Sequence, residues 1–274
     1  MLRVLISVDM EGIAGVVDPE DVQPGHPEYE RNRVLMTAEA SAAVRGVIAA
    51  DPDAHVLVTD AHASFRNLLP DQLDRRAELI RGKPKPDGML AGLDQNADAT
   101  IFIGYHGQAG TFRSVLAHTI NGGVIADVRC NGRSHGELGL NAALAASSGA
   151  PAVLVAGDDT VAAEAADVAP GMRTVVVKRA LGGTAAISLH PAEACDRIEQ
   201  QVPEALAIRA TVEAPQFDGG LELEVEVFRP RQAERALLVP GVQLVGNGRT
   251  VRYAAADIRA AYQMVQLISI LGSG

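Results

Sequence analysis

The sequence contains no tryptophan, and its aromatic residues make up only 3% of the chain. Proteins that bind single-stranded nucleic acid stack the bases on aromatic side chains, so little material for such binding is present. The chain also lacks a basic excess, because its formal net charge is -10. That charge disfavours contact with nucleic acid or with an anionic membrane surface. We therefore expect neither a nucleic-acid partner nor a membrane partner.

Cysteine is equally scarce, with only Cys130 and Cys195 and no CxxC motif. This excludes a disulfide framework and a cysteine metal site. No apolar segment reaches the length that spans a membrane, and no signal-peptide pattern opens the chain. We expect a cytoplasmic location. Hydrophobic residues, by contrast, make up 47% of the 274 residues, which is enough for one large domain or two smaller ones.

The first twelve residues combine a strand pattern with two acids. The apolar run of residues 4–6 predicts a buried strand, and Asp9, Glu11 and Gly12 follow it. Ligands of open α/β sheets bind at the carboxyl ends of strands, and residues two apart share one face. Two adjacent carboxylates repel each other, so we expect a positive charge between them, most simply a metal ion. The alternative is a pair of solvated loop acids. Gly12 is expected to let the backbone turn sharply beneath the metal.

Two further predicted strands end in the same way. Residues 56–59 form an apolar run followed by Asp60 and His62, and residues 99–104 form another followed by His106. Apolar residues recur at helical spacing between the first two strands, from about residue 27 to 50. A strand, a helix and a strand in succession predict a parallel pair. The strand ends would then meet at one sheet edge, which favours a metal site over separate loop residues.

Two other segments supply candidates. Glu137 opens a predicted helix within a glycine-flanked apolar stretch, which favours burial with a partner over a purely dipole-favoured acid. His118 is either a loop residue or a group that transfers a proton or stabilises an oxyanion. Three residues stand in second rank: Asp60 as a residue that orients a ligand, and Asp158 and Asp159 as a helix cap. Lys178, at a predicted strand end, either contacts an anionic substrate group or is a solvated side chain.

The order of the predicted elements indicates an α/β fold, with a mostly parallel central sheet and helices on both faces in three layers. The pattern changes beyond about residue 190. Residues 221–228 alternate apolar and acidic side chains, which predicts a one-sided antiparallel strand. We therefore expect a metal-binding catalytic core over residues 1–188. An α+β portion over residues 189–274 would pack on this core or at an oligomer interface.

Oxygen and imidazole ligands without thiolates suit Zn²⁺, Mn²⁺ or a similar ion. One carboxylate bridging two ions is the usual arrangement of a two-metal hydrolase. The site residues alone leave several activities open. They fit a metallo-aminopeptidase, a two-metal phosphoesterase or amidase, or a metal-binding, ring-forming protein without catalysis.

Several segments, in this order along the chain, resemble the zinc-dependent D-aminopeptidase family of the bacterial dipeptide-transport operon. They are SVDMEG at 7–12, DAH at 60–62, GYH at 104–106, the segment around His118, GELGLN at 136–141 and VLVAGDD at 153–159. The resemblance implies two zinc ions per subunit, with Mn²⁺ or Co²⁺ as substitutes, and a catalytic role for His118. The implied metal ligands are Asp9 (as the bridge), Glu11, His62, His106 and Glu137.

The same resemblance implies an activity and an assembly. Members of the family release N-terminal residues, typically D-amino acids, from short peptides, and they assemble into a ring-like homo-decamer. The loop from Gly107 to Ala117 departs from the family's pattern. We therefore expect an aminopeptidase that acts on short peptides as a homo-oligomer.

Overall fold

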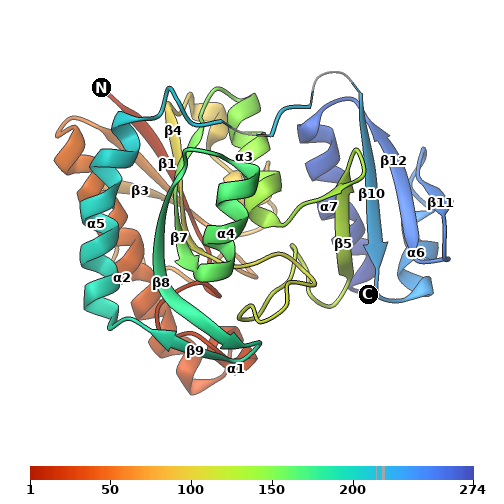
Figure 1. Ribbon diagram of the computed structural model, residues 1–274, viewed down its shortest axis with the longest axis horizontal. Helices are drawn as coiled ribbons and strands as arrows, with labels where there is room; N and C mark the ends of the chain where they lie inside the picture. Colours follow the sequence, from red (N-terminus) through yellow and green to blue (C-terminus); the bar gives the residue numbers. More distant parts are fainter. Residues whose placement is uncertain (214, 218–219) are drawn as a thin grey trace.

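The computed structural model describes residues 1–213, 215–217 and 220–274. Within these ranges the chain forms a seven-stranded sheet and a five-stranded sheet (Figure 1). The larger sheet has the order β3-β2-β1-β4-β7-β8-β9, and all its neighbouring strands are parallel except β8 and β9. Its strands are β1 (Arg3–Val8), β2 (His55–Asp60), β3 (Ala77–Ile80), β4 (Ala99–Tyr105), β7 (Ala152–Asp158), β8 (Arg173–Gly182) and β9 (Ala185–Ser188).

Helices cover both faces of the larger sheet. The side chains of Val4, Ile6 and Val8 pack with α2 (Pro27–Ala50) and α5 (Pro191–Ala207). Leu5 and Phe102 face the other way, toward α3 (Glu137–Ser147) and α4 (Asp159–Val168). Because both faces are covered, the central strands are apolar throughout rather than alternating. The predicted three-layer α/β fold, with a mostly parallel sheet, is confirmed.

The smaller sheet is antiparallel, with the order β11-β12-β10-β5-β6. Its strands are β5 (Ile125–Cys130), β6 (Arg133–Ser134), β10 (Leu221–Val227), β11 (Gln243–Val245) and β12 (Thr250–Ala255). The predicted one-sided strand at 221–228 is β10, whose apolar residues are buried. Two helices accompany this sheet, α6 (Pro230–Ala236) and α7 (Ile258–Gly272). The helix α7 also packs against α3, so it joins the two halves of the molecule (Figure 1).

The two sheets exchange segments of the chain. The strands β5 and β6 precede residue 188 but belong to the smaller sheet, where β5 pairs with β10 and β6 pairs with β5. Conversely, α5 follows residue 188 and packs on α2. The division into residues 1–188 and 189–274 stays a prediction.

Short elements complete the structure. A one-turn helix α1 (Pro19–Val22) follows β1, and two 3₁₀ turns lie at η1 (Gly88–Leu90) and η2 (Leu93–Gln95). No helix in the described part of the chain is long and apolar enough to cross a membrane. The strand β1 lies between β2 and β4, so the carboxyl ends of these three strands are neighbours. In open α/β sheets, ligands bind at this edge, where the strand order reverses.

Candidate metal centre

The carboxyl ends of β1, β2 and β4 bring four of the predicted residues together. The His62 Nδ1 atom lies 3.2 Å from Asp9 Oδ1 and 3.0 Å from Glu11 Oε2. The His106 Nε2 atom lies 3.6 Å from the other oxygen of Asp9, Oδ2. All four side chains are buried. Asp9 therefore has one oxygen toward His62 and the other toward His106, which is the arrangement that a bridging carboxylate needs.

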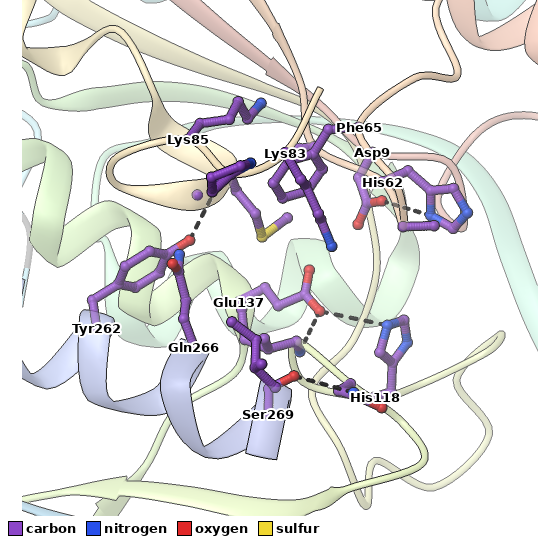
Figure 2. Close-up of a pocket in the computed structure, with 18 of the residues that line it drawn as sticks. Asp9, His62, Phe65, Lys83, Lys85, His118, Glu137, Tyr262, Gln266 and Ser269 are labelled. Atoms are coloured by element: carbon purple, nitrogen blue, oxygen red, sulfur yellow. Dashed lines mark hydrogen bonds and ion pairs between the residues drawn. The ribbon is translucent and has the colours of Figure 1, made fainter. Parts of the chain in front are cut away.

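Glu137 and His118 complete the group from outside these strand ends. Glu137 is the first residue of α3, and its Oε2 lies 3.7 Å from His106 Nε2. His118 Nε2 lies 3.6 Å from Glu137 Oε1, and its ring stacks on that of His106 with the centroids 4.3 Å apart. The backbone N–H of Ile120 donates to Glu137 Oε1 at 2.7 Å and holds this carboxylate in place. Figure 2 shows Asp9, His62, His118 and Glu137 around one cavity.

These six residues are named the His–carboxylate cluster below: Asp9, Glu11, His62, His106, His118 and Glu137. The structure thus places all the residues predicted as ligands, and the predicted catalytic histidine, within one cluster.

Each histidine of the cluster has one ring nitrogen directed at a backbone carbonyl. His62 Nε2 lies 3.0 Å from the carbonyl oxygen of Val22, and His106 Nδ1 lies 3.1 Å from that of Gly107. His118 Nδ1 lies 2.9 Å from the carbonyl oxygen of Leu116. A carbonyl only accepts hydrogen bonds, so in each ring this nitrogen carries the proton. The other nitrogen then faces the carboxylates, and such support is typical of histidines that bind a metal.

The spacing of the donor atoms fits metal coordination. Two ligand atoms at about 2.1 Å from a tetrahedral zinc ion lie roughly 3.4 Å apart. The separations of 3.6 and 3.7 Å from His106 Nε2 to Asp9 and Glu137 are close to this value but too long for hydrogen bonds. Among the described residues, the buried His106 Nε2 has no hydrogen-bond partner. A buried polar atom without a partner is costly, and a metal ion would satisfy it.

Two triplets have donor atoms that all lie within 4.8 Å of one another, Asp9–Glu11–His106 and His106–His118–Glu137. His62 lies closer still to Asp9 and Glu11. The two triplets share His106, and His62 adds a further donor beside Asp9 and Glu11, so the cluster has donor atoms enough to hold a metal ion. By distance alone, His118 could serve as a ligand or as a neighbouring catalytic group.

The charges within the cluster also favour a cation. Burial raises the pKa of Glu11, but the charges on His62, His118 and His106 outweigh burial and hold this pKa well below its ordinary value. Burial lowers the pKa of His106, yet Glu137, Asp9 and Glu11 raise it to about 10. Burial keeps the pKa of Glu137 above its ordinary value. Three carboxylates in a buried space need positive charge, which protons on the histidines or metal ions can supply.

Lys178 supports the loop that carries Glu11. Its side chain is only 1% exposed, and its ammonium group donates to the carbonyl oxygens of Glu11, Ile13 (3.0 Å) and Val16 (2.5 Å). Of the two roles considered for it, contact with a substrate anion and solvation, neither matches this environment. Burial lowers the pKa of Lys178 to about 8. The three bonds fix the turn between β1 and α1 on which the carboxylate of Glu11 stands.

Glycine is required at position 12 for a different reason from the expected one. It does not adopt a positive φ, so the turn does not require glycine for its dihedral angles. Its N–H donates to the carbonyl oxygen of Gly104 at 2.7 Å, and a Cβ at position 12 would lie 1.9 Å from the carbonyl oxygen of Tyr105. The loop after β1 therefore packs backbone to backbone against β4, and this close approach brings Asp9 and His106 together.

The residues of second rank have structural roles. The carboxylate of Asp60 accepts hydrogen bonds from the backbone N–H groups of Asn67 and Leu68, and the Asn67 amide donates to the carbonyl oxygen of His62. Asp60 thus shapes the loop that carries His62 without touching its ring. Asp158 caps α4 through the N–H of Val161, which confirms the predicted cap.

A cavity of about 650 Å³ opens over the cluster. Its wall includes residues that the sequence patterns did not single out: Phe65, Lys83, Lys85, Tyr262 and Gln266 (Figure 2). The last two belong to α7, which lies far along the chain from the strand ends. Helical spacing marks a buried face, but nothing in it indicates which cavity that face borders. This cavity size is in the range of sites for small ligands.

Comparisons with known proteins agree with this geometry. A family model described as D-aminopeptidase matches residues 2–267. A D-aminopeptidase of Bacillus subtilis (strain 168) is 35% identical over 270 residues, covering 98% of this chain and 97% of the relative. The solved structure of DppA from Bacillus subtilis is similar with a TM-score of 0.95 and 34% identity, over 99% of this chain and 98% of that one. DppA is described as a zinc-dependent D-aminopeptidase and a self-compartmentalizing protease.

Proposed function

The chain belongs to the D-aminopeptidase family and is an enzyme of that class, and on this premise we propose that it uses a dinuclear zinc site to release N-terminal D-amino acids from short peptides. The observation that carries the proposal is the position of Asp9, with one oxygen directed at His62 and the other at His106. Zinc is the metal of the similar solved structure, and the donor set of imidazoles and carboxylates suits it.

In this proposal Asp9, Glu11 and His62 would hold one zinc ion, and Asp9, His106 and Glu137 would hold the other. Bound zinc supplies a water of lowered pKa and polarises the scissile carbonyl. The backbone carbonyls of Val22 and Gly107 keep the two histidines in the tautomer that leaves a nitrogen free for the metal.

His118 acts as the proton-transfer group. Its Nδ1 is committed to the Leu116 carbonyl oxygen, so Nε2 faces the cavity. There, Nε2 takes a proton from the attacking water and delivers it to the leaving amine. Glu137 Oε1, at 3.6 Å, stabilises the protonated ring between these two steps.

The size of the cavity suits a short peptide, whose free amine would bind beside the metal centre at the cavity floor. We also propose that the chain assembles into a homo-oligomer, with the ring-like decamer of the resembling family as the specific form. The self-compartmentalizing description of the similar solved structure supports an assembly of this kind.

The proposal is tested by substituting His106 with alanine. We expect the wild-type protein to bind two zinc ions and to hydrolyse D-alanyl p-nitroanilide, with loss of activity in a chelator and little turnover of the L-isomer. His106→Ala should lose zinc, and its activity should fall by more than the roughly hundredfold that loss of a supporting residue causes. His55→Ala is the matched control, because His55 pairs with Glu78 at 2.8 Å, away from the cluster.

Two outcomes would contradict the proposal. One is full zinc content and activity in His106→Ala. The other is turnover of an aryl phosphate without turnover of any aminoacyl amide, which would point to a phosphoesterase on the same cluster.

A further inference from the structure

A second charged feature lies across the cavity from the His–carboxylate cluster. Two lysines, Lys83 and Lys85, line the cavity on the loop between β3 and η1. Their ammonium groups lie 4.5 and 4.1 Å from the centre of the Phe65 ring. Contact with the face of an aromatic ring holds a cation in place without neutralising it. The cavity therefore has acidic side chains at one end and fixed positive charge at the other.

The two lysines are not equivalent. The Lys85 ammonium donates to the hydroxyl of Thr59 at 2.7 Å and to the carbonyl oxygen of Asp60 at 2.5 Å, so it is engaged by the protein. Lys83 is exposed, and no carboxylate in the described ranges lies within 4.0 Å of its ammonium group. Figure 2 shows Lys83 beside Phe65, with its side chain directed into the cavity that Asp9 and Glu137 also line.

We propose that Lys83 binds the C-terminal carboxylate of the peptide substrate and thereby selects short peptides with a free C-terminus. This inference rests on the proposed function. A short peptide is a zwitterion, with a cationic amine at one end and a carboxylate at the other. The amine end of the substrate binds beside the proposed metal centre, where the scissile bond lies, and Lys83 matches the carboxylate at the other end. In a cavity of about 650 Å³, both ends of the site can be reached together only by a short chain.

The test compares substrates with the same scissile bond and different C-terminal charge. They are D-Ala-D-Ala, its neutral C-terminal amide, and D-alanyl-D-isoglutamine, whose only carboxylate is on the side chain. For D-Ala-D-Ala, we expect Lys83→Met to lower kcat/KM by about ten- to hundredfold, the range for a charged hydrogen bond. For the neutral amide the change should stay within about twofold. Lys83→Arg should retain the preference for the free acid.

Arg81→Met is the matched control. It removes a positive charge from the same loop, but Arg81 lines a different pocket and donates to the carbonyl oxygen of Arg66. It should leave the ratio of kcat/KM for acid and amide unchanged. The inference is overturned if Lys83→Met changes both substrates equally or neither. It is also overturned if only the isoglutamine peptide depends on Lys83, because the residue would then recognise a side chain.

Failure of the proposed function would be visible separately, as absence of hydrolysis of all three peptides by the wild-type protein. Calorimetric titration with D-Ala-D-Ala and its amide would then test Lys83 directly. Tighter binding of the acid that disappears in Lys83→Met supports the inference, and equal or absent binding overturns it.

Discussion

Replacement of Lys178 by methionine tests how the loop that carries Glu11 is held. Methionine retains most of the side-chain volume but removes three hydrogen bonds to the carbonyl oxygens of Glu11, Ile13 and Val16. Hydrogen bonds to a charged group contribute about 1.5 to 3 kcal/mol each, so their joint loss costs about 5 to 9 kcal/mol. Against this, methionine avoids the desolvation of an ammonium group that is 1% exposed, which costs several kcal/mol. We expect a net loss of about 3 kcal/mol in the free energy of unfolding.

The more specific consequence concerns zinc. Without the ammonium group, the backbone of Glu11 loses a donor, and its carboxylate loses a fixed position. Zinc affinity should fall about 10- to 100-fold, as is typical when a residue that orients a ligand is removed. Urea denaturation measures the stability, and competition with a chromophoric chelator measures the affinity.

Leu206→Ala provides a control of matched stability. Leu206 is buried in α5, outside the cluster, and its truncation should cost about 2 to 5 kcal/mol. Zinc affinity should be unchanged in this variant. If Lys178→Met were destabilised to the same degree as Leu206→Ala but bound zinc as tightly as the wild type, Lys178 would be a core residue without influence on the site. Unchanged stability would refute the assigned strength of the three hydrogen bonds.

Two further substitutions examine the supports of the same loop. Burial raises the pKa of Glu39 to about 7 from an ordinary 4.5. Between these two pH values the folded protein therefore binds more protons than the unfolded chain. Because of this difference, the folded protein loses stability as the pH rises from 4.5 to 7. Glutamine at position 39 still accepts a hydrogen bond from the Ala14 N–H but does not titrate. Between pH 4 and pH 8, the free energy of unfolding of Glu39→Gln should therefore rise by about 3 kcal/mol relative to that of the wild type, as measured by urea denaturation. A difference between the two proteins that does not depend on pH would contradict this. Gly12→Ala places a Cβ 1.9 Å from the carbonyl oxygen of Tyr105 and should lower the free energy of unfolding by about 3 kcal/mol or more, as measured by thermal denaturation. The variant should also lose zinc, as measured by metal analysis. A folded Gly12→Ala protein with full zinc content would show that the close approach to β4 is not needed.

The strand-end residues could be predicted because local pattern and topology act together there. An apolar run identifies a strand from a few residues, and the intervening helix makes the next strand parallel. The residues Asp9, His62 and His106 follow adjacent strands, so no information about distant packing is required to bring them together. For Glu137 and His118, no comparable rule of strand topology predicts a position beside these residues. Their sequence context made them candidates, as an acid at a buried helix start and as a loop histidine, but only the resemblance to a known family joined them to the strand-end residues.

Other features depend on packing that no local pattern records. Lys178 follows a run of three valines in β8, a position that fits a solvated strand end as well as a buried one. Its burial results from the loop after β1, which is more than 160 residues away. The residues Tyr262 and Gln266 face the cavity because α7 packs between α3 and the second sheet. Helical periodicity in a sequence can indicate a buried face, but the partner of that face follows only from the tertiary structure.

The six residues of the cluster are held in two ways, and the difference agrees with the roles proposed for them. The proposed ligands are at most 7% exposed in their side chains. They stand directly after central strands, on the loop that Lys178 secures, or at the start of a buried helix, which fixes their positions throughout a reaction. His118 stands on a loop, and 23% of its side chain is exposed to the cavity. A group that takes a proton from water and passes it to a leaving amine has to reach both, so this exposure suits proton transfer better than permanent coordination.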